Sequence, residues 1–586
     1  MTFKFLLSYL SGAIFIWYLL NIHILANLSL LLNLSLSKYL IIGAILGAVS
    51  AIGLMLYFYA KNVLNILWVL IPVAILSLTF VYSLAVTHQI YDISFDGQAY
   101  HGEAINTMLE GWNPIHQPQS QGRNSYADST DQYVFLDSYP KLAWYHSAIV
   151  HDLTGDYRDI KVLNLAILIP TLIFVFLALS RFEFSKDFFR NNAIRLLLTV
   201  LITINPITLV QATTVSIDGL VYSLLVILMS ILVHIYLEYQ NEIQNQFSLW
   251  LHFINLAAVY CVLSNVKTSG LVYASFFVGG FGFYLFLQKG WQIRNFLITF
   301  VISVVLAVCV FGFNPYITNS IYYKSPLYPV FNSKVDYYSI NTPINIRDKN
   351  NIEVLVYSIL SIGDMGDYIN AKLPFVIYGT EMDALVHTQA KKAGFGPLFS
   401  GALVLSLISI VILIYEMYVA ITQNKGDLKD RYRYFGKLAL FVSILASLLA
   451  SVIITKNSSS FRLVPQLWLL LVVPIIYSFT SHFQIARILG IITSAVVILN
   501  LIIIGGIYFG NQLKVSDIVT TKLHNLEKSG DYFKIYFGYS TGTRQLFREN
   551  NIYYQYSIDP ANKCANTFKD FQFNQDSNVF VCTIPN

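Results

Sequence analysis

Residues 63–86 read VLNILWVLIPVAILSLTFVYSLAV and contain no charged side chain. A helix needs about 20 apolar residues to cross the hydrocarbon core of a bilayer, and this run is long enough. Similar runs recur along the 586-residue chain, in which 56% of the residues are hydrophobic and 12% are charged. Soluble domains carry about 25% charged residues, so this composition excludes a water-soluble fold for roughly the first 510 residues.

Hydropathy and loop signals together predict an all-α polytopic membrane protein with about thirteen transmembrane helices. The first run has only Lys4 as a basic flank and no evident small-residue cleavage site, so we interpret it as a helix and not as a signal peptide. The expected spans lie near residues 5–22, 38–60, 63–86, 160–180, 194–212, 217–237, 248–264, 269–288, 295–313, 397–421, 435–455, 463–480 and 486–509.

These spans divide the chain into six expected parts. The parts are three N-terminal helices (1–86), a first polar loop (87–159), a central bundle (160–313), a second polar loop (314–396), C-terminal helices (397–510) and a small polar domain (511–586). No internal repeat of the kind found in inverted-repeat transporters stands out.

Basic residues indicate the orientation of the chain. With a cytoplasmic N-terminus, most of them fall on the cytoplasmic side, as the positive-inside rule requires: Lys61, Arg181, Lys186, Arg190, Arg195, Lys289, Arg294, the cluster at 425–437 and Arg487. We therefore expect a bacterial inner membrane protein with both polar loops and the C-terminal domain outside the cytoplasm, where Cys564 and Cys582 can form a disulfide. The net charge of +5 is spread over short loops, so we expect no nucleic acid partner.

The segment 91–104, YDISFDGQAYHGEA, concentrates polar side chains directly after an expected span. It holds three carboxylates and a histidine. If a helix begins after Gly97, Asp96 lies near the helix N-terminus, where backbone amides favour an anion. An ionised carboxylate in this place suits a general base or a metal ligand. It suits a simple helix cap equally well.

Residues 96–104, DGQAYHGEA, resemble the D-E-x-x-Y-x-x-x-A motif in the first outer loop of GT-C glycosyltransferases, such as the aminoarabinose and protein O-mannosyl transferases. In that family the acidic residue is catalytic, so the resemblance implies a GT-C-like fold with Asp96 as catalytic base and Tyr100 in substrate binding. Gly97 stands where the second acid of the motif usually lies. The further catalytic candidates in this stretch are Asp92, His101 and Glu103.

A second stretch, YPKLAWY at 139–145 followed by LTG at 153–155, is similar to the K-P-P-L-Y-Y…G stretch that closes the same loop in GT-C enzymes. The resemblance implies that Lys141 contributes to substrate binding. The alternative is an amphipathic surface helix, because Trp and Tyr favour membrane interfaces.

Three charged residues lie at expected outer boundaries of helices. Asp218 resembles the acid that begins a later helix in the family and would join Asp96 around a metal or an acceptor, although it also suits an N-cap. Lys267 violates the positive-inside trend, so its counter-ion is either a lipid-linked phosphate or, if it snorkels, an anionic headgroup. Arg462 resembles the arginine that opens a late GT-C helix and suits a bidentate phosphate clamp.

The resemblance implies a hexosyl or pentosyl transferase. It would move a sugar, with inversion, from a polyprenyl-phosphate donor to a glycan, lipid or protein acceptor in contact with membrane lipids. A divalent ion, Mg²⁺ or Mn²⁺, would have Asp96 and Asp218 as its ligands. The sequence has no glycine-rich phosphate-binding loop, so we expect no nucleotide substrate.

Two other classes remain open: an O-antigen polymerase- or ligase-like enzyme, and a flippase or transporter of lipid-linked glycans. A transporter would spread intramembrane charges through several helices. Here the charges cluster at one boundary. The polymerases and ligases usually carry their main loop late in the chain, whereas Asp96 follows an early span.

Overall fold

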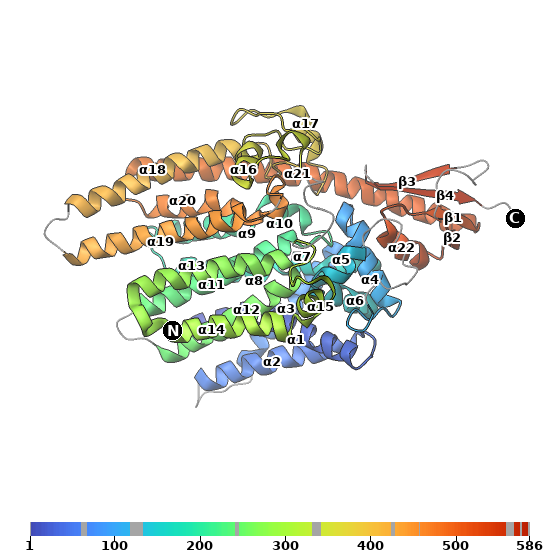
Figure 1. Cartoon of the computed structure of the whole chain (residues 1–586), viewed down its shortest axis with the longest axis horizontal. Coiled ribbons are helices and arrows are strands. Elements are labelled where there is room, and N and C mark those ends of the chain that lie inside the picture. The colour runs from blue at the N-terminus through green and yellow to red at the C-terminus, as the bar shows by residue number, and fades with distance from the viewer. Residues whose placement is uncertain are drawn as a thin grey trace.

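The chain forms a bundle of long helices with a small mixed domain at one end (Figure 1). The computed structural model describes residues 2–59, 67–117, 133–240, 245–330, 342–388, 390–423, 428–455, 457–557, 568–574 and 577–583. The long helices are α1 (Phe3–Leu31), α2 (Tyr39–Tyr59), α3 (Leu67–Thr87), α8 (Leu168–Ser180), α9 (Phe188–Thr203), α11 (Asp218–Gln240), α12 (Gln246–Val266), α13 (Thr268–Lys289), α14 (Arg294–Val305), α18 (Phe399–Gln423), α19 (Leu428–Ile453), α20 (Leu469–Thr480) and α21 (Gln484–Ser529).

Within the described residues, nine segments are long and apolar enough to cross a membrane. One of them, Thr268–Val310, covers the predicted span 269–288 and most of the span 295–313, and two further apolar helices, Ala439–Ile453 and Pro465–Thr480, are shorter. Each predicted span overlaps one of the long helices. The prediction of a helical, membrane-embedded protein is therefore confirmed.

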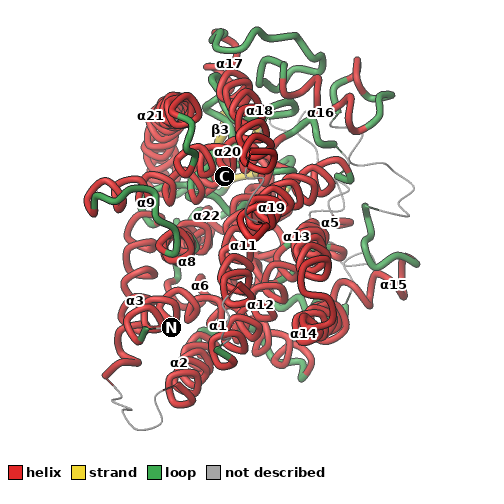
Figure 2. The backbone as a smooth tube through the Cα atoms, turned by 90° about the vertical axis from the view of Figure 1, so that its left-hand side faces the viewer, coloured by secondary structure: helices red, strands yellow, loops and turns green. Residues whose placement is uncertain are grey.

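Helix α11 is the centre of the bundle. It packs against α8, α12 and α13, and Figure 2, which views the helices nearly end-on, shows it between the α1–α12 side and the α19–α20 side. Most of its residues are buried, including Leu224, Leu228 and Ile231. This helix is apolar around its whole circumference, which is the expected composition of a fully enclosed helix.

Short elements gather at one end of the bundle, on the right of Figure 1. We call this end the loop-bearing end. From the first polar loop come η1 (Gly97–His101), α4 (Gly102–Leu109), α5 (Tyr133–Ser138), α6 (Leu142–Thr154) and η4 (Tyr157–Lys161), followed by α7 (Val162–Ala166) and α10 (Pro206–Gln211). The second polar loop adds α15 (Thr318–Tyr323), α16 (Asn351–Ile359) and α17 (Gly379–Ala384).

The C-terminal domain is not purely helical. It has a four-stranded sheet of order β2-β1-β4-β3, built from β1 (Phe533–Tyr536), β2 (Tyr554–Tyr556), β3 (Phe568–Asn574) and β4 (Ser577–Thr583), with α22 (Arg544–Glu549) beside it. Strands β1 and β2 are parallel, and the other two pairs are antiparallel. Cys582 is disulfide-bonded, whereas Cys564 lies outside the described residues.

Helix α21 extends well beyond its predicted end near residue 509. It has 46 residues and ends at Gly530, which adopts a left-handed conformation with φ of +65°. The hydropathy signal stops where the apolar run stops, but residues 510–529 contain neither Pro nor a Gly beyond position 510, so nothing interrupts the helix. The C-terminal domain therefore begins about 20 residues later than predicted.

A single extended residue, Lys267, connects α12 to α13. The turn is tight because Gly270 lies directly against the end of α12: a Cβ atom at this position would stand 2.5 Å from the backbone oxygen of Leu263. No flexible side chain can move aside there. Gly270 therefore fixes the place at which Lys267 leaves the bundle.

We expect Gly270→Ala to destabilise the protein by about 1–3 kcal/mol, because the added methyl group overpacks a backbone contact. Gly53→Ala in α2 is the matched control, since a Cβ there has nothing within 4 Å and alanine favours a helix by roughly 0.5–1 kcal/mol. Thermal unfolding of both variants in the same detergent measures the difference. Equal stability of the two variants would contradict the tight turn.

Candidate functional site

Asp96 and Arg462 form an ion pair at the loop-bearing end. Arg462 donates from Nη1 to Oδ2 of Asp96 over 2.5 Å, although the two residues are 366 positions apart. Both side chains are largely buried, with 13% of Asp96 and 18% of Arg462 exposed. The hydroxyl of Tyr100 donates to the same oxygen over 3.3 Å.

A second ion pair joins Asp218, the first residue of α11, to Lys267 between α12 and α13. Gln211 from α10 holds the start of α11: its side chain accepts from the amide of Gly219 over 2.8 Å and donates to Asp218 over 3.4 Å. Asp218 and Lys267 thus come from elements that share one end of the bundle.

The two ion pairs belong to one electrostatic site. The charges of Asp96, Lys267, Asp218 and Arg462 all act on the buried ring of His101, and Asp218 also acts on Arg462. The structure therefore brings together the six sequence-predicted residues Asp96, Tyr100, His101, Asp218, Lys267 and Arg462. We call this set the charged cluster.

The protonation state of Asp96 follows from its neighbours. Burial raises the pKa of this carboxyl, but the charge of Arg462, the neighbouring His101, the Arg462 hydrogen bond and the charge of Lys267 together outweigh burial, and the pKa lies below its ordinary value. Asp96 is therefore ionised at neutral pH, as the sequence predicts for a base.

His101 is neutral in this site. Burial lowers its pKa to about 4, and its Nδ1 accepts a hydrogen bond of 2.7 Å from the indole of Trp144. A ring nitrogen that accepts leaves the proton on the other nitrogen, Nε2. His101 consequently supports the turn that carries Asp96, and its uncharged ring leaves the charge balance of the cluster unchanged.

Asp92 faces the backbone instead of the charged cluster. Its carboxylate accepts from the amides of Ser94 (2.7 Å) and Val215 (2.8 Å), which ties the first loop to the segment before α11. Burial raises its pKa. A Cβ at Gly97 would stand 2.2 Å from the Asp92 carboxylate, so this position, acidic in the GT-C motif, has no room for a side chain here.

Two further candidates have their charged groups engaged elsewhere. Lys141 is fully buried, donates to the carbonyls of Asp137 and Tyr139, and has its pKa lowered to about 7 by burial. Glu103 contacts Arg544 of the C-terminal domain. Among the described residues, neither side chain has an ion pair or a hydrogen bond with a member of the charged cluster.

A cleft opens beside Arg462. Its walls are mostly apolar and come from α10, the segment around α17 and α21, through Pro206, Ile207, Val210, Leu385 and Ile504. Glu381 also lines it, paired with the buried Lys372. Sequence reasoning did not single out these second-loop residues, because a buried pair in a polar loop has no local sequence signal.

The segment that carries Arg462 is fastened to the second loop. The amide of Phe461 donates to the carbonyl of Ala393 over 2.8 Å, and the hydroxyl of Ser460 donates to the carbonyl of Ala390 over 2.6 Å. Tyr273 of α13 donates to the carbonyl of Leu463. The residues on either side of Arg462 in the sequence are therefore fixed, and Arg462 itself lines the cleft.

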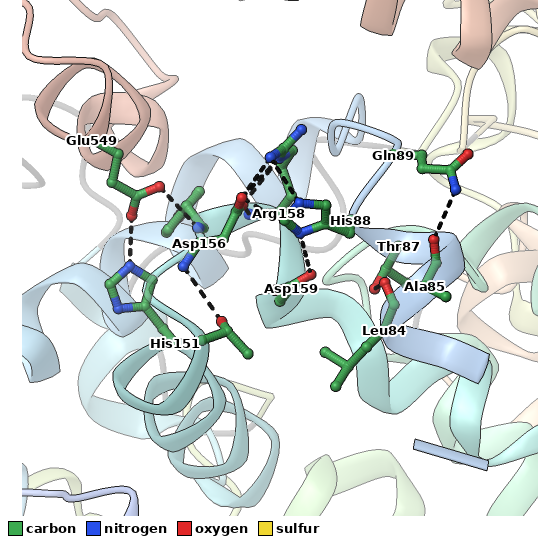
Figure 3. A network of polar contacts seen from close by, with 12 residues as sticks. Leu84, Ala85, Thr87, His88, Gln89, His151, Asp156, Arg158, Asp159 and Glu549 are labelled. Carbon is green, nitrogen blue, oxygen red and sulfur yellow. Dashed lines mark hydrogen bonds and ion pairs between the residues drawn. The ribbon is translucent and has the colours of Figure 1, made fainter. Parts of the chain in front are cut away.

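The charged cluster does not fit a divalent metal as it stands. Each of its two carboxylates is neutralised by its own cation, so a metal at Asp96 and Asp218 would face two positive side chains. Among the described residues, the set with suitable spacing for a metal is His88, Asp156 and Asp159. Figure 3 shows Arg158 between them, with Nη2 2.6 Å from Asp156 and 3.2 Å from His88. We read this second set as an ion-pair network and derive no step through a metal.

Comparison with known proteins does not extend this picture: no protein-family model matches the chain, and no curated protein matches it significantly. The site is therefore interpreted from its own geometry and chemistry.

The Asp96–Arg462 pair predicts a change in the pH dependence of stability. In the wild type the folded pKa of Asp96 is depressed, so the contribution of this pair is present above pH 3.9 and disappears as the pH falls through the folded pKa. In Arg462→Gln, burial dominates and raises this pKa, so ionisation of Asp96 costs stability as the pH rises above about 3.9.

Thermal unfolding between pH 3 and pH 8 tests this reversal. The stability of each chain is compared with that of the same chain carrying Asp96→Asn, so that other titrating groups cancel. We expect Asp96 to stabilise the wild type at pH 7 by about 1–3 kcal/mol and to destabilise the Arg462→Gln background at the same pH. If Asp96 stabilised, or destabilised, both backgrounds at pH 7, Arg462 would not determine the stability contribution of Asp96.

Proposed function

We propose that this protein is a GT-C-type integral membrane glycosyltransferase that transfers a sugar, with inversion, from a polyprenyl-phosphate donor to an acceptor. One observation carries the proposal: four segments distant in sequence bring two carboxylates, one of them the ionised Asp96, and two cations to one end of the membrane helices, beside an apolar cleft. A lipid-linked phosphosugar has the matching parts, namely an apolar chain, an anionic phosphate and an electrophilic anomeric carbon.

The cleft is small, about 40 Å³, so it would contact one part of the lipid end of such a donor. Pro206, Ile207, Val210, Leu385 and Ile504 offer apolar contacts to an isoprenoid chain. Arg462 lies at the same cleft, and its planar guanidinium binds phosphate oxygens in a bidentate manner. Lys267 adds a second positive charge in the same electrostatic site.

Asp96 is the proposed base. Its carboxylate takes the proton from the acceptor hydroxyl or amine, the acceptor oxygen or nitrogen forms a bond to the anomeric carbon, and the bond from this carbon to the phosphate oxygen breaks. The phosphate leaves with the bonding electrons, and Arg462 and Lys267 stabilise its added negative charge. Attack opposite to the leaving phosphate inverts the anomeric carbon.

Arg462 has two roles in this scheme. In the present structure it neutralises Asp96 and lowers its pKa, which makes Asp96 a weak base. A donor phosphate competes for the same guanidinium. When the phosphate binds, Asp96 loses part of this interaction, its pKa rises, and its strength as a base increases only in the presence of the donor.

The proposed orientation has the loop-bearing end outside the cytoplasm of a bacterial inner membrane. Arg181, Lys289 and Arg487 lie at the ends of α8, α13 and α21 that are remote from the charged cluster, as a cytoplasmic position requires. Of the other predicted topology signals, Lys61 and part of the 425–437 cluster lie outside the described residues.

A transporter would need polar groups along a path through the bundle. A second buried polar group does lie near the other end of α11, where Glu238 pairs with Arg181 and accepts from Ser248, and His234 stacks on His252. Asp218 and His234 are 16 residues apart, or about 24 Å along the helix. The intervening buried residues of α11 are mainly Leu, Ile and Val, which favours the enzyme.

The deciding experiment measures transfer of radiolabelled sugar from a panel of polyprenyl-phosphate donors by the purified protein in nanodiscs. We expect Asp96→Asn to lower kcat by at least ~100-fold, because the substitution removes the base with little change in volume. Asp367→Asn is the control: it neutralises an exposed carboxylate of the second loop, and we expect wild-type transfer.

Three outcomes would overturn the proposal. Full transfer by Asp96→Asn would reduce Asp96 to a structural carboxylate. Failure of the wild type with every donor, combined with movement of a lipid-linked glycan across proteoliposomes, would identify a transporter. Repeated extension of a glycan on its lipid carrier would identify a polymerase-like enzyme instead.

A separate prediction concerns donor binding. Arg462→Lys keeps the charge but loses the bidentate geometry, so we expect the KM for the donor to rise about tenfold, and Arg462→Gln to raise it by up to ~100-fold. Steady-state kinetics with the donor varied at saturating acceptor gives both values. An unchanged donor KM in Arg462→Gln would place the phosphate elsewhere.

A further inference from the structure

A buried ion pair joins the first loop to the C-terminal domain. Nη1 of Arg544 lies 2.6 and 2.5 Å from the two carboxylate oxygens of Glu103, and neither side chain is more than 2% exposed. Nη2 of the same arginine contacts Glu110 at 2.8 Å, and Glu110 also binds the more exposed Arg548 at 2.6 Å. Glu103 and Glu110 both belong to the stretch that follows Asp96.

The two backbones touch at the same place. A Cβ added to Gly102 would stand 3.0 Å from the Cα of Gly542, and one added to Gly542 would stand 2.5 Å from the backbone oxygen of Gln98 and 2.8 Å from the Cα of Gly102. Two glycines therefore allow η1 and α4 to lie directly on the turn before α22. Any side chain at Gly542 would force these backbones apart.

Hydrogen bonds close this contact on each side of the glycines. Asn106 donates to the carbonyl of Gly542 over 2.9 Å, and Ser540 donates to the side chain of Gln98 over 3.3 Å. Glu549 of α22 accepts from the amide of Tyr157 over 2.9 Å and contacts His151 at 2.6 Å (Figure 3). The C-terminal domain thus contacts both described parts of the first loop, 87–117 and 133–159.

These contacts between the first loop and the C-terminal domain involve the segment that directly follows Asp96. Asp96 directly precedes η1 and α4 directly follows it, with a kink at Ala99 inside η1. Gln98, which contacts Ser540 and Gly542 of the C-terminal domain, lies on the Asp96 side of this kink. Within the membrane-attached part, η1 is also held by the bond from Trp144 to His101 and by the bond from Gln98 to the carbonyl of Asp92. The direction in which Asp96 leaves η1 therefore depends on the C-terminal domain as well as on the membrane helices.

We infer that the C-terminal domain is a positioning element of the site and that Glu103 and Arg544 are its principal positioning residues. They set the place of Asp96 relative to Arg462 without touching a substrate. This inference rests on the proposed function in so far as it concerns catalysis. Its structural half, the coupling of the domain to Asp96, stands independently of the reaction.

The experiment compares Glu103→Gln, Arg544→Ala and Gly542→Ala in the full chain. The first two remove the ion pair, and the third separates the backbones while leaving every charge in place. Arg548→Ala is the matched control, because it removes a neighbouring arginine whose side chain is 44% exposed. Hydrogen–deuterium exchange of residues 97–109 and 541–549 measures how well the contact between the first loop and the C-terminal domain protects their backbone amides.

We expect exchange in these two segments to become ~10–100-fold faster in the three test variants and to change little in Arg548→Ala. Protection of α11 and α12 stays at the wild-type level, which shows that the bundle is folded. In the transfer assay kcat falls in parallel, whereas the KM for the donor does not rise, because a weaker pair with Asp96 leaves the Arg462 guanidinium freer to bind the donor phosphate.

A readout independent of transfer keeps the two proposals distinguishable. The coupling between Asp96→Asn and Arg462→Gln, measured by thermal unfolding, is expected to fall in the Glu103→Gln background. Unchanged coupling, or faster exchange with wild-type kcat, would overturn the positioning role. Absence of transfer by the wild type with lowered coupling would overturn the proposed function and leave the positioning role intact.

Discussion

A carboxylate and a guanidinium that are mostly removed from water each need a partner of opposite charge. Asp96 and Arg462, 366 positions apart in the chain, neutralise each other in this way. Breaking such a pair leaves an uncompensated charge, which costs several kcal/mol in a poorly hydrated place. The first loop, the second loop and the helices around α11 are arranged so that this pair, and beside it the pair of Asp218 and Lys267, can close. The same closure brings a base and two cations to an apolar cleft.

The positions of the helices and the members of the charged cluster were predictable from local sequence. Apolar runs of sufficient length define membrane helices, because the bilayer allows few other structures. Asp218, Lys267 and Arg462 stood out for a similar reason: each is a charge directly beside an apolar run, where an unpaired charge is expensive. Their convergence on Asp96 is what the sequence led us to expect of a single site.

The environments of the other candidates were not predictable in this way. The partner of Glu103 is Arg544, 441 positions later in a tail without a recognisable motif, and nothing in the local stretch distinguishes a buried ion pair from a reactive carboxylate. The contact between Asp92 and the amide of Val215 explains why residue 97 is glycine, yet both residues belong to segments that meet only in three dimensions. Lys141 carries a cationic side chain but serves as a donor to backbone carbonyls.

Helix α21 links the membrane to the C-terminal domain as one continuous rod of 46 residues, roughly 69 Å long. Membrane helices adjust to bilayer thickness mainly by tilting. Because about 30 Å of this rod projects beyond its apolar run, a tilt of 10° displaces its far end by roughly 5 Å. The C-terminal domain, which contacts the first loop, would therefore move with any change in the tilt of α21 relative to the other helices.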